Sequence, residues 1–138
     1  MRRGIVYIMR GPSGFGKTTE AKRIIAKNGG VGMIHSTDNY FYDEHGNFQF
    51  DPRLLSKYHA WNLTAFMHSL EQGVPIVICD NTNLEKRDYF PYLEAASKFG
   101  YSVRIVRMPY IDPIIAAGRN VHGVDALTIS NMMNRFED

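Results

Sequence analysis

The sequence predicts an α/β fold in which helices cover both faces of a small parallel β-sheet. Apolar runs of strand length alternate along the chain with segments of helical period, which is typical of parallel sheets. Glycines follow the predicted helices, where the chain has to turn. The chain has 138 residues, of which 44% are hydrophobic and 22% are charged, as in a single soluble domain. We therefore expect one three-layer domain over residues 1–138.

Four apolar runs have the length and composition of strands, at residues 4–9, 31–35, 75–79 and 101–108. The first three runs lack polar alternation, as expected for strands that are covered on both faces. The third run contains Cys79, which is the single cysteine of the chain, and we expect it to be buried rather than reactive. The expected order of the strands across the sheet is 2-3-1-4.

Four segments have the 3.6-residue period of helices, at residues 17–27, 53–72, 84–98 and 125–136. Thr82 and Glu85 have the spacing of a capping box, which predicts the start of the third helix. The apolar face predicted for the second helix includes Trp61, Phe66 and Leu70. These helices alternate with the strands, so each one can cross over the sheet.

The net charge is only +2, but it is distributed unevenly. Residues 1–69 hold nine Lys and Arg against five Asp and Glu, whereas residues 70–138 hold seven against nine. The first half is therefore the better candidate for binding an anion. The apolar run that follows the basic start of the chain ends at Arg10 and is too short for a signal peptide or a membrane span. We expect a cytoplasmic protein that does not contact a membrane.

Residues 11–18 read G-P-S-G-F-G-K-T, which matches the phosphate-loop pattern G-x-x-x-x-G-K-[ST] between a strand and a helix. Glycines let backbone N–H groups converge on a phosphate, and the helix adds the partial positive charge of its N-terminus. In this pattern the lysine contacts the β- and γ-phosphates and the Thr hydroxyl binds Mg²⁺. We expect ATP and Mg²⁺ as ligands, with the nucleotide held by Gly11, Ser13, Gly14, Phe15, Gly16, Lys17, Thr18 and Thr19.

Phosphate binding alone does not decide what receives the phosphoryl group. A GTPase needs an Asn-Lys-x-Asp segment, and no Asn of this chain is followed by Lys. A kinase needs a carboxylate near the acceptor hydroxyl, at the carboxyl end of a neighbouring strand. Asp38 follows the second strand and is a candidate general base, although a turn residue would have the same spacing. Asp80 ends the third strand and is a candidate Mg²⁺ ligand through water, or a turn residue.

A lid is predicted near residues 111–124. Its polar segment A-G-R-N-V-H-G-V contains Arg119, which would stabilise charge on the phosphoryl group in transit and contact ATP. The five histidines have no metal-ligand spacing, and we assign no metal to them. The irregular stretch 37–52 is rich in aromatic residues. Its rings either stack on an extruded base or pack the loop onto the sheet.

Four motifs occur together in the order and spacing of the polynucleotide-kinase-like branch of the phosphate-loop kinases: G-P-S-G-F-G-K-T at 11–18, H-S-T-D-N-Y-F at 35–41, D-N-T-N at 80–83 and G-R-N-V-H-G-V at 118–124. The chain resembles this branch over essentially its whole length. The resemblance implies that Lys17 and Thr18 bind ATP and Mg²⁺, with Asp80 in the metal shell. It implies that Asp38 is the general base and Arg119 the lid arginine. The residues that we expect to bind the acceptor are Asp38, Tyr40, Phe41, Asp80 and Asn83.

The chain departs from this pattern at two positions. Phe41 stands where the phage polynucleotide kinases carry an arginine, and Gly118 stands where a basic residue often precedes the lid arginine. The chain is short and lacks these two basic residues on its acceptor side. In both respects it resembles small phage kinases that phosphorylate 5-hydroxymethyluridine within DNA. The acceptor therefore stays open between that base and a polynucleotide 5′-hydroxyl. The alternatives are a kinase for a nucleoside or another small molecule, and a non-catalytic ATP-dependent binding module.

Overall fold

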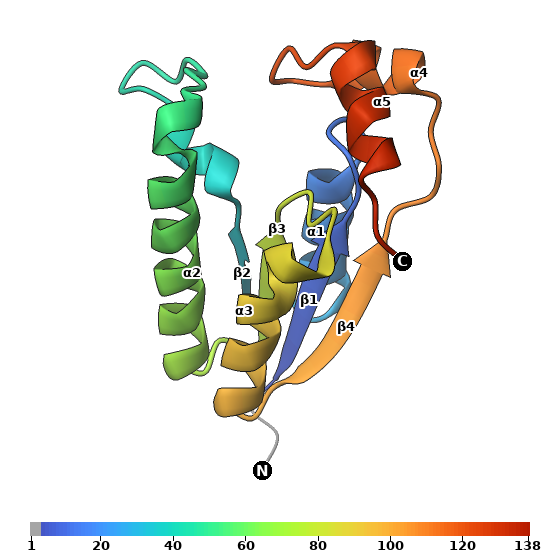
Figure 1. Cartoon of the computed structure of the whole chain (residues 1–138). Coiled ribbons are helices and arrows are strands. Elements are labelled where there is room, and N and C mark those ends of the chain that lie inside the picture. Colours follow the sequence, from blue (N-terminus) through green and yellow to red (C-terminus); the bar gives the residue numbers. More distant parts are fainter. Residues whose placement is uncertain (1–3) are drawn as a thin grey trace.

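The computed structural model describes residues 4–138, so the basic residues Arg2 and Arg3 lie outside the described range. Four parallel strands form one sheet in the order β2-β3-β1-β4, and this confirms the predicted fold class and strand order. The strands are β1 (Ile5–Arg10), β2 (Gly32–His35), β3 (Ile76–Asp80) and β4 (Ser102–Arg107). Figure 1 shows their carboxyl ends meeting at one edge of the sheet.

Helices cover both faces of the sheet because successive residues of a strand point to opposite sides. On one face, Val6 and Ile8 of β1 share a buried core with residues of α2 (Leu55–Glu71) and α3 (Lys86–Lys98). On the other face, Tyr7 and Met9 pack with residues of α1 (Lys17–Lys27). The two cores make the predicted three layers, and the central strands β1 and β3 are buried almost throughout. Cys79 is fully buried, as expected.

Three local predictions are corrected by the structure. The second strand is not covered on both faces, because β2 is an edge strand and Met33 is 47% exposed. The capping box of α3 pairs Glu85 with Asp88 rather than Thr82 with Glu85, so the helix begins at Lys86. Trp61 is 47% exposed instead of lying in the core, since the buried face of α2 is carried by residues further along the helix.

The segment predicted as a lid, residues 111–124, contains a short helix that was not expected, whereas the helix after it was expected at residues 125–136. Short helix α4 (Pro113–Arg119) and helix α5 (Ala126–Asn134) contact each other beyond the end of β4. Their buried residues Ala116 and Ile129 form a small core with Phe15 of the phosphate loop. This lid core therefore attaches the lid directly to the loop that it covers.

The loop after β2 lies on the opposite side of the phosphate loop from the lid (Figure 1). It begins with the 3₁₀ helix η1 (Thr37–Phe41) and ends with a second one, η2 (Pro52–Leu54), which leads into α2. The phosphate loop, this aromatic loop and the lid thus all lie at the carboxyl edge of the sheet. Within residues 4–138, no helix is both long and apolar enough to cross a membrane.

Candidate active site

The phosphate loop has a backbone conformation that requires glycine at two positions. Gly14 has φ of 81° and Gly16 has φ of 83°, in the left-handed region that other residues rarely adopt. At Gly14 space is limiting as well, since a Cβ there would lie 2.2 Å from the carbonyl oxygen of Ala116 in α4. The loop is tied to the neighbouring strand connection by a hydrogen bond of 2.9 Å from the Gly11 N–H to the Thr82 carbonyl.

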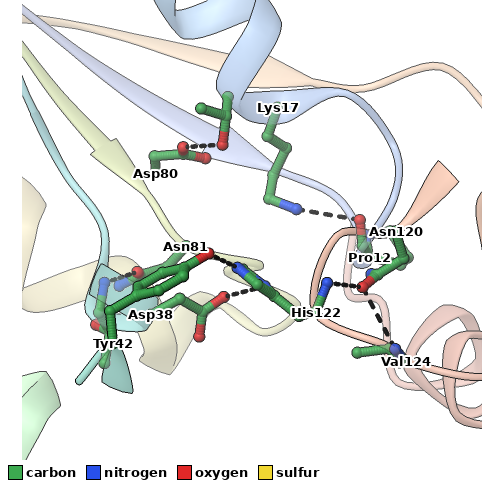
Figure 2. Close-up of polar contacts among 11 residues, drawn as sticks. Pro12, Lys17, Asp38, Tyr42, Asp80, Asn81, Asn120, His122 and Val124 are labelled. Carbon is green, nitrogen blue, oxygen red and sulfur yellow. Dashed lines mark hydrogen bonds and ion pairs between the residues drawn. The ribbon is translucent and has the colours of Figure 1, made fainter. Parts of the chain in front are cut away.

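Lys17 begins α1 and turns back along the loop, where its Nζ donates to the Pro12 carbonyl at 3.0 Å. Burial lowers the pKa of the Lys17 ammonium, while the nearby carboxylates of Asp80 and Asp38 act in the opposite direction. The ammonium therefore lies between the loop and two acidic side chains (Figure 2). A charge in this place is available to bind phosphate oxygens.

Asp80 and Thr18 bring two oxygen ligands together at the end of β3. The Asp80 side chain is buried, with a residue exposure of 4%, and its pKa is raised by that burial despite the hydrogen bond from Thr18 and the charge of Lys17. Hydroxyl and carboxylate oxygens are the ligands that Mg²⁺ prefers, and a cation would relieve the cost of burying the charge. The pair fits a magnesium site. In residues 4–138 we find no cluster of three or more His, Cys, Asp or Glu side chains arranged as a metal site.

Asp38 lies on η1, whose start is fixed to the end of β3. The Thr37 backbone N–H donates to Asn81 Oδ1 at 2.9 Å, and the Thr37 hydroxyl lies 3.0 Å from His59 Nδ1. These contacts hold the first turn of η1 beside the phosphate loop. The Asp38 side chain is 45% exposed, and its carboxylate Oδ2 lies 3.3 Å from Nδ1 of the lid residue His122. Its carboxylate is therefore accessible at the wall of the site.

One cavity of about 250 Å³ joins these parts. It is lined by the phosphate loop, the start of η1, the end of β3 and the lid: Ser13, Gly14, Gly16, Lys17, Thr18, Thr19, Ser36, Asp38, Asp80, Asn81, Thr82, Arg119, Asn120, Val121 and His122. Arg119 reaches over the phosphate loop, since a Cβ built on Gly16 would lie 3.6 Å from its guanidinium. The structure thus brings together five predicted residues from four separate parts of the sequence: Lys17, Thr18, Asp38, Asp80 and Arg119.

The other residues predicted for the acceptor side do not line this cavity. Phe41 is 3% exposed and packs against the rings of Phe50 and Tyr58. Tyr40 packs against Tyr58 and Trp61. The rings of this loop therefore pack mainly on one another and on α2, which favours the packing interpretation over base stacking.

Asn83 and Phe15 make packing contacts that were not predicted from the sequence. Asn83 is buried with φ of 47°, and its Nδ2 donates to the Met9 carbonyl at 2.7 Å, so its side chain joins two strand ends instead of facing an acceptor. The ring of Phe15 packs in the lid core. Only the backbone of this residue is therefore left to contact a bound phosphate.

Sequence reasoning missed Arg10, which is buried at the end of β1. Its guanidinium donates to the carbonyls of Asn83 and Leu84, and it stacks on the rings of Tyr89 and Phe136. The side chain thereby braces the segment that follows Asp80. A buried arginine at the end of an apolar strand was the available signal. The partners could not be identified from spacing, because they come from the loop after β3, from α3 and from the C-terminal tail.

A family model described as an AAA domain matches residues 6–122. The chain belongs to this AAA domain family. It is 34% identical over 137 residues to the human NEDD4-binding protein 2, an alignment that covers 96% of this chain but 8% of that protein. The chain thus spans a small part of its curated relative.

Solved structures share the fold of this family member at low sequence identity. A chain of the Pnkp1/Rnl/Hen1 RNA repair complex matches with a TM-score of 0.73 and 13% identity, over 99% of this chain and 45% of that one. A gluconokinase from Sinorhizobium meliloti 1021 matches with a TM-score of 0.61 and 16% identity, over 100% and 78%. A shikimate kinase from Acinetobacter baumannii has a TM-score of 0.51 and 19% identity, over 96% and 72%. The chain therefore has the fold of the P-loop kinases.

Proposed function

We propose that this domain is an ATP-dependent kinase that transfers the γ-phosphate of ATP to a hydroxyl group on a polynucleotide. The observation that carries the proposal is the shared cavity in which the Asp38 carboxylate faces the phosphate loop and Arg119. A module that only bound ATP would need the loop but no carboxylate aimed at an acceptor. A carboxylate and an arginine at the same phosphate site are the groups that a phosphotransferase uses.

In this proposal each side chain has a defined task. The acceptor hydroxyl oxygen attacks the γ-phosphorus, the bond from that phosphorus to the β–γ bridging oxygen breaks, and ADP leaves. Asp38 accepts the proton of the hydroxyl. Lys17 and Arg119 place positive charge beside the phosphoryl oxygens during the transfer. Thr18 and Asp80 are the residues that would hold Mg²⁺, which supplies further neutralisation of phosphate charge when bound.

A polynucleotide acceptor is supported by the four sequence motifs and by the structural similarity to a chain of an RNA repair complex. The burial of Phe41 bears on how such an acceptor would be held. Because a ring packs at this position, no cation at position 41 can anchor an acceptor phosphate. Recognition then depends on the hydroxyl-bearing group itself, and the contact with the backbone is expected to be weak and sensitive to salt. Both the 5′-hydroxyl end and the hydroxymethyl group of 5-hydroxymethyluridine are hydroxyl-bearing groups that can be recognised in this way.

A small-molecule acceptor is the second candidate. The cavity of about 250 Å³ is modest in volume, and the fold is similar to that of gluconokinase and shikimate kinase. Free nucleosides or sugars would have to occupy the space beside Asp38. This candidate is favoured if such molecules compete with DNA for phosphorylation.

The experiment offers labelled ATP with four separate acceptors: a 5′-hydroxyl oligonucleotide, a 5′-blocked duplex that contains 5-hydroxymethyluridine, a nucleoside mixture and gluconate. We expect label on one of the polynucleotides, and mapping the product identifies the hydroxyl. Asp38→Asn should abolish transfer while ATP affinity stays within about threefold, because the substitution removes the base but leaves the phosphate loop intact. Glu44→Gln, an exposed change in the same loop, is the matched control. Label only on the small molecules would reject the polynucleotide acceptor.

A further inference from the structure

The lid residue His122 lies between Asp38 and an aromatic hairpin, residues 42–48, of the facing loop. Its Nδ1 is 3.3 Å from Asp38 Oδ2, and its Nε2 is 2.9 Å from the Tyr42 hydroxyl oxygen (Figure 2). The ring of Phe48 stacks on the imidazole, with 4.1 Å between centroids and 14° between planes. The imidazole therefore has a hydrogen-bond partner at Nε2, the Asp38 carboxylate within ion-pair distance of Nδ1, and a stacked ring on one face.

The hairpin that receives His122 is locally well built. Tyr42 and Phe48 form an antiparallel bridge, so their side chains lie next to each other. The Asp43 carboxylate accepts hydrogen bonds from the backbone N–H groups of His45 and Asn47 and closes the turn between them. The hairpin can thus present its two rings to the lid without help from a ligand.

The lid turn that carries His122 is also held by its own contacts. Asn120 Oδ1 accepts hydrogen bonds from the backbone N–H of His122 at 2.7 Å and of Val124 at 3.3 Å. Arg119, which reaches over the phosphate loop, directly precedes this turn. Docking His122 on the hairpin therefore also fixes the part of the lid that carries the arginine.

Building on the proposed kinase reaction, we propose that His122 is a positioning residue that orients the Asp38 carboxylate toward the acceptor when the lid is closed. In this proposal a neutral imidazole turns its Nδ1–H toward the Asp38 carboxylate, 3.3 Å away. Its Nε2 must then accept a hydrogen bond, and the Tyr42 hydroxyl supplies that donor. The contact engages Oδ2 of Asp38 and leaves Oδ1 to accept the acceptor proton. Tyr42 thus selects the Nδ1–H tautomer of His122, and this tautomer orients the Asp38 carboxylate.

This arrangement couples closure of the lid to the orientation of the Asp38 carboxylate. The same few residues of the lid bring Arg119 to the phosphate side of the cavity and His122 to the acceptor side. With the lid open, Asp38 would lose the partner that holds its half-exposed side chain. Such coupling limits transfer to complexes in which both substrates are enclosed.

Three substitutions at His122 separate its possible roles. His122→Asn keeps an N–H donor near the position of Nδ1, His122→Gln places one near Nε2, and His122→Ala removes both. We expect kcat to fall about 10- to 100-fold in His122→Ala and His122→Gln and clearly less in His122→Asn, with ATP affinity unchanged. His45→Ala, an exposed histidine on the same hairpin, is the control and should leave kcat unchanged. Equal losses in the Asn and Ala variants would reject the positioning role, and faster transfer in His122→Ala would show that His122 blocks the acceptor.

A double-mutant cycle tests whether Tyr42 acts through His122. Tyr42→Phe removes the hydroxyl and keeps the ring, and we expect a fall in kcat of about threefold to tenfold in the wild-type background. In the His122→Ala background the same change should have no further effect. Additive losses would mean that the hydroxyl does not act through the imidazole, and this would reject the chain of contacts.

The tautomer itself gives a readout that does not need an acceptor. Long-range ¹H–¹⁵N NMR spectra, with the His122 signals assigned by their loss in His122→Gln, are followed to the alkaline limit where they stop changing. We expect the proton on Nδ1, and a shift of the population toward the Nε2–H form in Tyr42→Phe. A proton on Nε2 in the wild type would overturn the inference. If none of the acceptors is phosphorylated, the kinase proposal fails, and the tautomer still decides the geometry on its own.

Discussion

The Thr18 hydroxyl donates a hydrogen bond of 2.7 Å to the carboxylate of Asp80, and this bond joins the first turn of α1 to the end of β3. The two residues come from elements that are separated by the whole of β2 and α2. Their contact places a hydroxyl and a buried carboxylate beside the phosphate loop, where a divalent cation and the phosphates of ATP would be bound together.

Asp80→Asn is expected to weaken ATP binding about tenfold or more in the presence of Mg²⁺, because a cation loses its charged partner. With EDTA present the same variant should bind ATP at least as tightly as the wild type, since a negative charge has been removed from the phosphate site. Calorimetric titration under both conditions measures the two affinities. Glu94→Gln, an exposed change on α3, is the control. An equal loss of affinity with and without metal would contradict a role in metal binding.

Arg119→Ala is expected to reduce kcat by about 10²–10³-fold, because a guanidinium over the phosphate loop stabilises charge that develops during transfer. ATP affinity should change much less, and Arg119→Lys should recover part of the rate. Steady-state kinetics with a saturating acceptor separates kcat from KM. Arg104→Ala, on the exposed side of β4, is a matched removal of positive charge. A rise in KM for ATP at unchanged kcat would assign Arg119 to ground-state binding instead.

Gly14→Ala is expected to destabilise the domain more than Gly30→Ala. Both glycines have φ near +80°, which costs an alanine about 1 kcal/mol. At Gly30 an added Cβ meets no atom within 4 Å, whereas at Gly14 it would lie 2.2 Å from the Ala116 carbonyl oxygen. Urea unfolding of the two variants gives the difference in the free energy of unfolding. Equal losses would mean that α4 moves aside at no cost and that the lid is not closely packed on the loop.

His35 is expected to make the folded state less stable as the pH falls below 6.5. Burial lowers the pKa of this imidazole to about 4, while its Nε2 lies 2.8 Å from the Ser69 hydroxyl. Between those two pKa values the unfolded chain binds more protons than the folded chain, so the free energy of unfolding drops by about 1.5 kcal/mol from pH 6.5 to pH 5. Urea titrations at the two pH values measure this drop.

His35→Gln should remove most of this pH dependence, and His45→Gln should keep it, because His45 lies exposed on the hairpin. If the wild type and His35→Gln lose the same stability on acidification, the buried imidazole is not the group responsible.

Local patterns were sufficient for much of the fold and for the nucleotide side of the site. Strand and helix periods, and the match at residues 11–18, depend on neighbours within a few residues, so they can be read directly. The positions of Tyr40, Phe41 and Asn83 could not be predicted from the sequence, because each of these side chains contacts partners from other elements. A motif states which residue types occur, and the burial of a side chain is decided by what the fold brings beside it.

The sequence by itself determined the α/β class, the strand order, the phosphate loop and the residues Lys17, Thr18, Asp38, Asp80 and Arg119 as candidates for one chemistry. Only the tertiary structure decided that these residues share one cavity and that His122 contacts both Asp38 and the aromatic hairpin. The physical reason is the parallel sheet, which collects the ends of distant strands at one edge and leaves loops far apart in the chain to face each other there.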